Sequence, residues 1–331
     1  MITKNYIAKG EGANRFEKIP VQIYETADEA VKAVAREIVD LVQTKAASSE
    51  KCVLGLATGV SPIKLYQELV RMHREEGVSF RNVVTFNLDE YLPMPKESEQ
   101  SYHYFMHHHL FDHIDIDPKN IHIPDGTLEG DEIDKFCRNY EKAIEAAGGI
   151  DLQILGIGRT GHIGFNEPGS FITSQTRKVF LNDLTIKDAI KDFGSRNLVP
   201  TKAITMGVGT IMKARRVVLL AWGEKKAPII KATVEGRVSD SVPATFLQMH
   251  SNVQFIIDES AASELTRADY PWLVSKVDWD KKLIRKAVLR LCQKLNKPIL
   301  KVEDKDYQEN GLNDLIEMFG SANKVNIEEF N

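Results

Sequence analysis

Residues 152–169 of this 331-residue chain read LQILGIGRTGHIGFNEPG. The first part, Leu152–Ile157, is apolar on both faces, as is typical of a strand buried in a parallel sheet. Residues 156–164 hold four glycines within nine residues, which lets the backbone approach a ligand closely. Its histidine, His162, can take or give a proton near neutral pH, and the nearby Glu167 can fix the tautomer of that ring. A buried strand that leads into a ligand-binding loop is therefore predicted here.

Four further apolar runs of this kind occur along the chain, with helical patterns between them. The runs are Cys52–Ala57, Val83–Asn87, Val217–Trp222 and Val253–Ile257. Apolar residues recur at helical spacing over Ala30–Leu41 and over Leu65–Met72, the second behind Ser61 and Pro62 as a helix cap. This alternation predicts an α/β fold with an open, mostly parallel, doubly wound sheet and helices on both faces. Ligands of such sheets bind beyond the carboxyl ends of the strands.

Three other strand ends carry candidate site residues. After the first run, Thr58, Gly59 and Ser61 enter a helix whose unpaired N–H groups suit a phosphate, although an ordinary tight turn has the same pattern. The second run leads to two adjacent acids, of which at most one is expected to face a ligand. Asp89 would be a proton shuttle there, or else solvated loop charge. After the run Val217–Trp222, Lys226 would close over a phosphate or begin a solvated helix.

Two motifs point to functions that their surroundings disfavour. Gly156, Gly158 and Gly161 form a dinucleotide-binding GxGxxG pattern behind a strand, but that motif must open a helix, and the residues that follow cannot continue as one. The three histidines at 107–109 suggest a metal, yet consecutive side chains project around a helix and cannot converge on one ion. We therefore predict no cofactor and no metal site.

The overall composition is that of a globular protein. Hydrophobic residues make up 43% and charged residues 27% of the chain, enough for a sizeable core. The net charge of −4 gives no reason to expect nucleic acid as a partner. The three cysteines have no zinc or disulfide spacing, which fits a reducing compartment, and no run approaches the ~20 apolar residues of a membrane span. A cytoplasmic protein without membrane contact is predicted.

The C-terminal part follows a different pattern. Lys281–Asn296 predicts an amphipathic helix, Pro298–Val302 a short strand, and Leu312–Phe319 another helix. We expect an α/β domain over residues 1–274, followed by a small C-terminal appendage or linker region over residues 275–331. The sequence does not indicate what this appendage does.

Four stretches carry a resemblance to a known family. In order, they are Val84–Tyr91, Ser101–Tyr102, Gly161–Pro168 and Ala203–Thr210. Through them the chain resembles the glucosamine-6-phosphate deaminase (isomerase) family from about residue 19 to residue 274. It is most similar to the N-terminal domain of longer bacterial deaminase-like proteins, in which a deacetylase-like domain follows.

The resemblance implies an amino-sugar phosphate isomerase/deaminase that converts glucosamine 6-phosphate and water to fructose 6-phosphate and ammonium. Asp89 matches the base that moves a proton from carbon 2 to carbon 1. His162 matches the group that protonates the ring oxygen, and Glu167 matches the acid that orients this histidine. The residues that match the phosphate-binding positions are Thr58, Gly59, Ser61, Lys226 and, loosely, Lys191. The resemblance also implies a homo-oligomer.

Three positions depart from the family pattern. Thr160 stands where members often carry an aspartate; a hydroxyl brings no negative charge, so weaker chemistry is expected from this part of the site. Val60 stands where many members have a second glycine in the phosphate loop, which narrows access to the backbone. Only Arg177 matches the allosteric site known on the lid of some members, which gives little reason to expect regulation by N-acetylglucosamine 6-phosphate.

Two alternatives to an active deaminase stay open. Thr160 and Val60 favour a sugar-phosphate-binding module with weak or lost catalysis. A sugar-phosphate lactonase would share the fold and the GxGxxGH core, but Ile163–Pro168 and the acids after the second run fit an isomerase better. The catalytic interpretation requires His162 and Asp89 to face one small cavity.

Overall fold

The structure, a computed structural model, describes residues 7–328 of the chain. These residues form two units. The larger is Glu17–Ala262, and the smaller contains the described residues up to Phe16 and from Ser263 onward. This division rests on compactness alone, so the boundary of the family domain at residue 274 stays a prediction.

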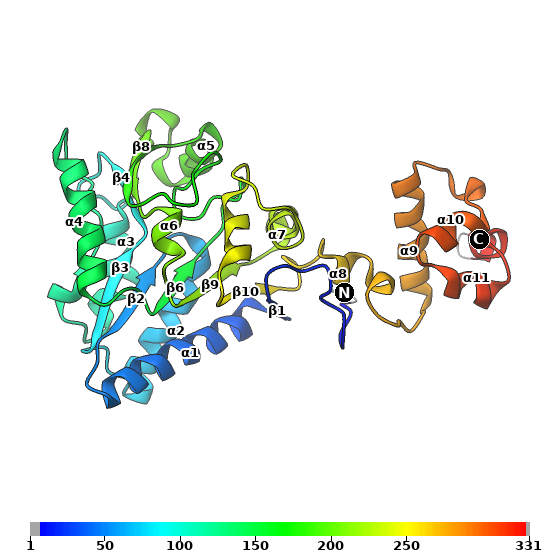
Figure 1. Ribbon diagram of the computed structural model, residues 1–331, viewed down its shortest axis with the longest axis horizontal. Helices are drawn as coiled ribbons and strands as arrows, with labels where there is room; N and C mark the ends of the chain where they lie inside the picture. The colour runs from blue at the N-terminus through cyan, green and yellow to red at the C-terminus, as the bar shows by residue number, and fades with distance from the viewer. Residues whose placement is uncertain (1–6, 329–331) are drawn as a thin grey trace. The chain divides into compact units, whose positions relative to one another are not determined.

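The larger unit is built on a seven-stranded sheet. Its strands are β1 (Val21–Tyr24), β2 (Cys52–Leu56), β3 (Val83–Asn87), β5 (Ile121–His122), β6 (Leu152–Leu155), β9 (Arg216–Ala221) and β10 (Val253–Asp258). They lie in the order β1-β10-β9-β6-β2-β3-β5, and all neighbours are parallel (Figure 1). The predicted α/β fold is confirmed, and the five apolar runs form the five inner strands.

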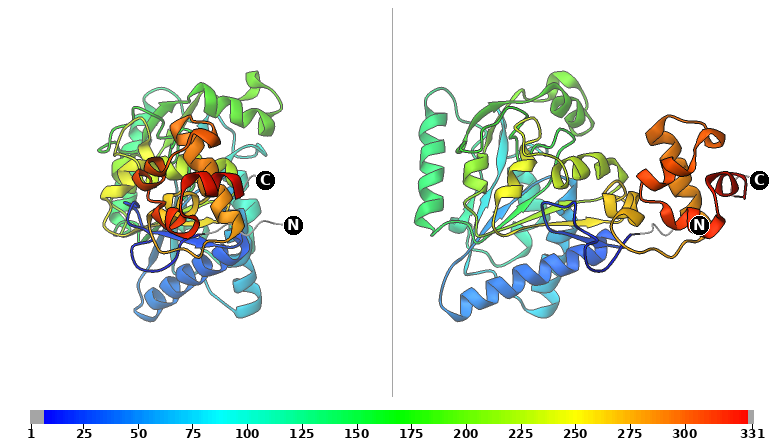
Figure 2. Two further views of the ribbon diagram at one scale, coloured as in Figure 1. Left: turned by 90° about the vertical axis from the view of Figure 1, so that its right-hand side faces the viewer. Right: turned by 45° about the vertical axis from the view of Figure 1, so that its right-hand side comes forward.

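Helices cover both faces of this sheet, as predicted. Helices α1 (Ala27–Ala47) and α2 (Val60–Glu76) lie along one face, and α4 (Glu132–Ala146), α6 (Val208–Ile211) and α7 (Ala227–Val234) lie across the other (Figures 1 and 2). Helix α1 begins where the Thr26 hydroxyl accepts a hydrogen bond from the Glu29 N–H, and it buries one apolar stripe. Among the described residues, no helix is both long and apolar enough to cross a membrane.

The start of α2 differs from the prediction of a serine cap. The N-cap is Gly59, no side chain caps the helix, and Ser61 and Pro62 lie inside the first turn. The φ of +94° at Gly59 is in the region that favours glycine, and it turns the backbone sharply from β2 into the helix. The helix therefore begins earlier than the Ser-Pro pair suggests.

A second, smaller sheet stands apart from the first and was not predicted. It is antiparallel, with β4 (Asp89–Leu92), β8 (Lys202–Thr205) and β7 (Arg177–Phe180) in that order. Helix α5 (Asp183–Phe193) connects β7 to β8. Strand β4 follows β3 after one residue, so the second of the apolar runs leads directly into this sheet.

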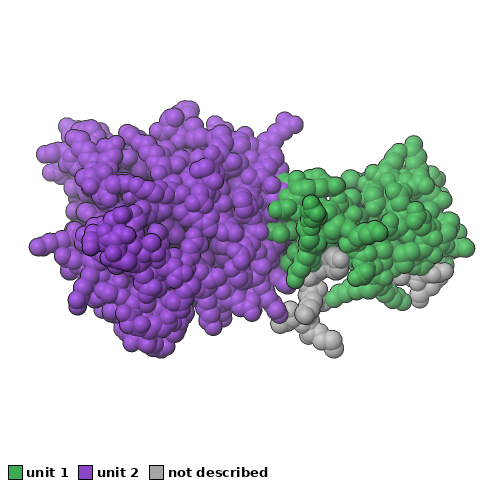
Figure 3. Space-filling model, turned by 60° about the horizontal axis from the view of Figure 1, so that its bottom comes forward, with its two compact units in different colours: residues 1–16, 263–331 green, residues 17–262 purple. Residues whose placement is uncertain are grey.

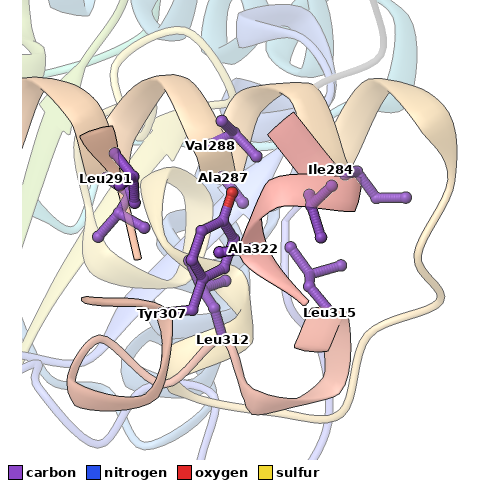
Figure 4. Packing of buried hydrophobic residues seen from close by; sticks show 10 residues of the cluster. Ile284, Ala287, Val288, Leu291, Tyr307, Leu312, Leu315 and Ala322 are labelled. Carbon is purple, nitrogen blue, oxygen red and sulfur yellow. The ribbon is translucent and has the colours of Figure 1, made fainter. Parts of the chain in front are cut away.

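The smaller unit, coloured green in Figure 3, is built of helices and has its own hydrophobic core. They are α8 (Thr266–Asp269), α9 (Lys281–Leu295), α10 (Asp304–Glu309), α11 (Asn313–Phe319) and α12 (Ala322–Glu328). Figure 4 shows Ile284 and Leu291 of α9 packed with Tyr307 and Leu315 of the following helices. The two predicted helices of this region are confirmed. The predicted strand is wrong: Ile299–Lys301 is a 3₁₀ turn, because Val302 packs into the helical core and no described strand follows β10.

Candidate active site

Four neighbouring strand ends bring the predicted site residues to one edge of the main sheet. Strands β9, β6, β2 and β3 are adjacent and parallel, so the segments after them leave the sheet at the same side. The chain runs outward from β2 to β3 and β5 and then returns to β6 on the other side of β2. This is the switch in strand order at which open α/β sheets bind ligands.

The segment after β6, residues 156–169, is named the histidine loop. Its backbone turns back at Gly158, which donates to the carbonyl of His162 at 3.0 Å. A Cβ added at Gly158 would lie 2.0 Å from His162 Nε2, so only glycine lets the imidazole fold over this point. No helix lies between β6 and β7, where every residue is described, so the GxGxxG pattern has no helix N-terminus to offer a dinucleotide.

His162 forms a three-membered network with Thr160 and Glu167. Its Nδ1 lies 3.0 Å from Thr160 Oγ1 and 3.2 Å from Glu167 Oε2, and Thr160 donates to the same carboxylate oxygen at 3.2 Å. A carboxylate only accepts, so the single proton of Thr160 belongs to Glu167 and the Nδ1 proton remains on the ring. Nε2 is then the nitrogen that is available to accept a proton.

Glu167 is held as an anion. The side chain is buried, and burial by itself would raise its pKa. The hydrogen bond and the positive charge from His162, together with the hydroxyl of Thr185, reverse this effect and lower the pKa below its ordinary value. Thr185 of α5 donates to Oε1, the oxygen that His162 does not use. The sequence analysis did not single out Thr185.

Asp89 begins β4 and is not solvated loop charge. It is 6% exposed, and among residues 7–328 no donor forms a hydrogen bond with its carboxylate. Burial, and then the negative charge of Glu90, hold the pKa of Asp89 well above its ordinary value of 3.8. A Cβ added at Gly164 would lie 3.3 Å from Asp89 Oδ2 and 2.9 Å from Thr205 Oγ1. The carboxylate therefore packs against the histidine loop, two residues beyond His162.

Glu90 points elsewhere, as expected of adjacent residues in a strand. Its carboxylate accepts from the N–H groups of Tyr91, Tyr102 and His103 at 2.9–3.0 Å, the last two at the start of α3 (Tyr102–His109). Burial raises the pKa of Glu90 to about 7, although these three hydrogen bonds act to lower it. Glu90 therefore anchors a helix, and its carboxylate has hydrogen-bond donors, unlike that of Asp89 within residues 7–328.

Lys226 lies beside the start of the histidine loop. Its Nζ donates to the carbonyl of Ile157 at 2.6 Å. Burial lowers the pKa of Lys226; the charge of Asp188 opposes this shift, and those of Lys191 and Arg159 add to it. Lys191 is thus close enough for its charge to act on Lys226, and both lie at the edge where a phosphate is expected.

The turn after β2 is joined to the same edge. Trp222 Nε1 donates to the carbonyl of Ser61 at 3.0 Å, and Trp222 directly follows β9, which leads to Lys226. Thr58 is half-buried and Gly59 is exposed. Val60 is 71% exposed, so its side chain projects into solvent.

The histidines at 107–109 and Arg177, which the sequence analysis also considered, include side chains that contact other protein groups. Within residues 7–328, no three His, Cys, Asp or Glu side chains are placed to hold a metal ion. His107 pairs with Asp112 at 2.7 Å instead. Arg177 donates to Asn166 Oδ1 at 2.9 Å and to Ser170 Oγ at 3.2 Å, and so braces the histidine loop.

Residues 25–256 match the sequence model of the glucosamine-6-phosphate isomerases/6-phosphogluconolactonase family. The chain belongs to this family. It is 48% identical over 236 residues to a glucosamine-6-phosphate deaminase of Thermoanaerobacter sp., a match that covers 71% of this chain and 92% of that one. The predicted membership of the deaminase (isomerase) family, and with it the prediction of an enzyme, is confirmed.

Another relative extends over almost the whole chain. A glucosamine-6-phosphate deaminase-like protein of Bacteroides thetaiotaomicron is 50% identical over 317 residues, which are 96% of this chain and 48% of that protein. The chain thus spans about half the length of this relative. Most of the smaller unit has a counterpart there, because the match is longer than the larger unit alone.

Solved structures show the same fold. A monomeric glucosamine-6-phosphate deaminase, 40% identical, matches with a TM-score of 0.71 and covers 74% of this chain and 100% of that one. The 6-phosphogluconolactonase of Trypanosoma brucei matches with a TM-score of 0.61 at 21% identity, over 75% of this chain and 99% of that one. The second likeness concerns the fold alone.

Proposed function

We propose that this chain converts glucosamine 6-phosphate and water to fructose 6-phosphate and ammonium. One observation carries the proposal. The segments that follow β6 and β3, on either side of β2 at the switch point, carry an oriented imidazole, His162, and a buried carboxylate with no hydrogen-bond donor among residues 7–328, Asp89. The family of the chain adds to this, since its relatives include proteins named for that reaction.

Ring opening is the first step, because the sugar is a closed ring whose oxygen must gain a proton before carbon 2 can react. His162 Nε2 faces away from Glu167; it would take the proton of the hydroxyl on carbon 1 and deliver it to the ring oxygen, so that the bond between carbon 1 and the ring oxygen breaks as the carbonyl forms. The network on Nδ1 keeps the ring in one orientation, and the Glu167 carboxylate stabilises the positive charge while the imidazole is protonated.

Proton transfer from carbon 2 to carbon 1 follows on the open form. Asp89 would take the carbon 2 proton and return it to carbon 1, which converts the amine at carbon 2 to an imine that water hydrolyses to the ketone and ammonium. Burial, with no donor in the described part of the chain, raises the pKa of this carboxylate and makes it a stronger base than an aspartate in water. A base whose pKa lies closer to the working pH is better suited to this step.

The phosphate would be held at the same edge, away from the reacting carbons. Lys226 and Lys191 supply positive charge, and the N-terminus of α2 with Thr58, Gly59 and Ser61 supplies N–H groups. This remote contact would position carbons 1 and 2 between the two proton-transfer groups. A cytoplasmic location and a homo-oligomer remain predictions, and the relative of known structure is described as monomeric.

The test is a coupled assay for fructose 6-phosphate and ammonium on the parent protein and on Asp89→Asn. We expect product from the parent and a kcat about 10²–10⁴-fold lower in the variant, the usual contribution of a proton-transfer group. Asp28→Asn is the control, because Asp28 forms an exposed ion pair with Lys64.

Two outcomes would count against the proposal. Turnover that Asp89→Asn leaves unchanged would remove Asp89 from the mechanism. If the parent protein binds glucosamine 6-phosphate but forms no product, the alternative of a sugar-phosphate-binding module is favoured. The uncharged Thr160 is the sequence feature that supports this alternative.

A further inference from the structure

Helix α5 is tied to the histidine loop at two points. In the buried one, the Thr185 hydroxyl donates to Glu167 Oε1. In the exposed one, Arg159 Nε and Nη2 lie 2.8 and 2.7 Å from the two oxygens of Asp188. Such a bidentate pair fixes orientation more than it adds stability at a surface. Thr185 and Asp188 are three residues apart, so one side of α5 faces the loop at both points.

The two oxygens of Glu167 have different partners. Oε2 accepts from Thr160 and lies against His162 Nδ1, while Oε1 accepts from Thr185. The terminal torsion of a glutamate is broad and has no deep wells of its own. The plane of this carboxylate is therefore set by its donors. Thr185 is a side-chain donor on the side away from the imidazole, and a backbone hydrogen bond from Asn182 adds to it.

We infer that Thr185 is a positioning residue for His162, which holds the Glu167 carboxylate in the plane that keeps the imidazole proton on Nδ1. The inference rests on the proposed function, which makes His162 the proton carrier. Thr185 acts through Glu167, and it comes from the helix that also carries Lys191. Helix α5 thereby contributes to both the phosphate end and the proton-transfer end of the site.

Loss of the Thr185 hydroxyl would change the tautomer of the histidine. Glu167 Oε1 would be left without this donor in a buried place, which is unfavourable for a carboxylate. The carboxylate would rotate toward another donor and weaken its contact with Nδ1. The tautomer with the proton on Nε2 would then gain population, and that form cannot accept a proton at Nε2.

The experiment compares Thr185→Val, which removes the hydroxyl at nearly constant volume, with Thr185→Ser, which keeps it. Thr233→Val is the matched control, because Thr233 is fully buried and its hydroxyl donates only to a backbone carbonyl of its own helix. The tautomer of His162 is read from the ¹⁵N shifts of its ring in full-length protein, with assignment by His162→Gln. Steady-state kcat and KM are measured on the same samples.

We expect Thr185→Val to increase the population of the Nε2–H tautomer and to lower kcat about tenfold, the rate equivalent of one hydrogen bond to a charged group, with KM nearly unchanged. Thr185→Ser should restore both values, and Thr233→Val should change neither. Ring shifts and kcat in Thr185→Val that match those of the Thr233→Val control would overturn the inference.

The ring shifts also separate this inference from the proposed function. If the parent protein shows no turnover but Thr185→Val still changes the tautomer of His162, the positioning role of Thr185 stands and the proposed reaction is wrong. If the parent shows turnover but the substitution leaves the tautomer of His162 unchanged, the proposed reaction stands and the positioning role of Thr185 is wrong. Should Thr185→Val not fold, Thr185→Cys replaces it, because a thiol of similar size is only a weak donor; the same tautomer change is expected, and its absence overturns the inference.

Discussion

The start of strand β4 and the histidine loop each hold a buried carboxylate, but in opposite ways. Glu167 in the loop has contacts with Thr160, His162 and Thr185, and its pKa is lowered. Asp89 in the strand has no donor among the described residues, and its pKa is raised. When the surroundings of two acids shift their pKa values in opposite directions, one acid can serve as a fixed anion and the other as a base.

The backbone explains why the two regions differ. Glycines let the histidine loop turn tightly beside the groups that contact Glu167: Gly161 has a φ of +77°, and a Cβ added at Gly158 would collide with the imidazole of His162. Strand β4 pairs with β8 along its length, and the free N–H groups of α3 are already taken by Glu90. Asp89 is left with burial and a negative neighbour. This arrangement is unfavourable for stability and suits a residue retained for function.

The largest effect in this comparison is expected when Glu167, the fixed anion, is replaced. We expect Glu167→Gln to lower kcat about ten- to hundredfold, because the protonated imidazole loses a charged hydrogen-bond partner worth ~1.5–3 kcal/mol. The variant should also be less stable than the parent at pH 7. The pKa of Glu167 is lower in the folded state, so its contribution is present above the unfolded pKa and is lost as the pH falls through the folded one.

Urea unfolding at pH 7 and at pH 3 measures this difference. The stability deficit of Glu167→Gln should shrink at the lower pH, and Glu132→Gln at the exposed start of α4 should show no such trend. A deficit that is equal at both pH values would mean that Glu167 stabilises the fold by packing and not as an anion.

Much of this architecture could be predicted from the sequence. Long apolar runs specify buried strands, and the glycines around His162 mark a loop where the backbone must come close to other atoms, as the contact of Gly158 with the imidazole shows. Asp89 and Glu167 were predicted as a base and an orienting acid, and these roles stay predictions; the structure shows both carboxylates buried, with Glu167 Oε2 3.2 Å from His162 Nδ1.

The rest depends on contacts that no local pattern encodes. Strands β4, β7 and β8 have four residues each, too few for a clear alternation. Thr185 is 18 residues from Glu167 and looks like any threonine in the first turn of a helix. The segment at 298–302 is apolar enough for a strand, but the helices around it offer no strand to pair with.

Removing the charge of Asp89, the carboxylate in strand β4, is expected to change the stability less than Glu167→Gln does and in the opposite direction. We expect Asp89→Asn to be more stable than the parent at pH 8, although its kcat is expected to be much lower. The folded pKa is raised, so the neutral acid is tolerated at low pH and its ionisation becomes unfavourable as the pH rises through that value. Each unit of raised pKa corresponds to about 1.4 kcal/mol above it.

Urea midpoints at pH 8 and pH 5 provide the measurement, with Asp28→Asn as the exposed control. The gain of Asp89→Asn should be larger at pH 8 than at pH 5. Lower stability than the parent at pH 8 would show that the strand end provides Asp89 with favourable partners, and the contrast with Glu167 would fail.

The smallest effect is expected for kcat when a charge is added to the histidine loop at Thr160. Thr160 already donates to Glu167 and lies 3.0 Å from His162 Nδ1, so Thr160→Asp would place a second anion beside the ring. The new charge favours the protonated imidazole but lies close to the Glu167 carboxylate, and repulsion cancels part of the benefit. We expect a gain in kcat of at most about tenfold, equivalent to ~1.4 kcal/mol. Thr160→Asn, which is similar in shape and uncharged, should give none. An equal kcat for Thr160→Asp and the parent would show that the orientation of His162, which the threonine already provides, matters more than the charge around it.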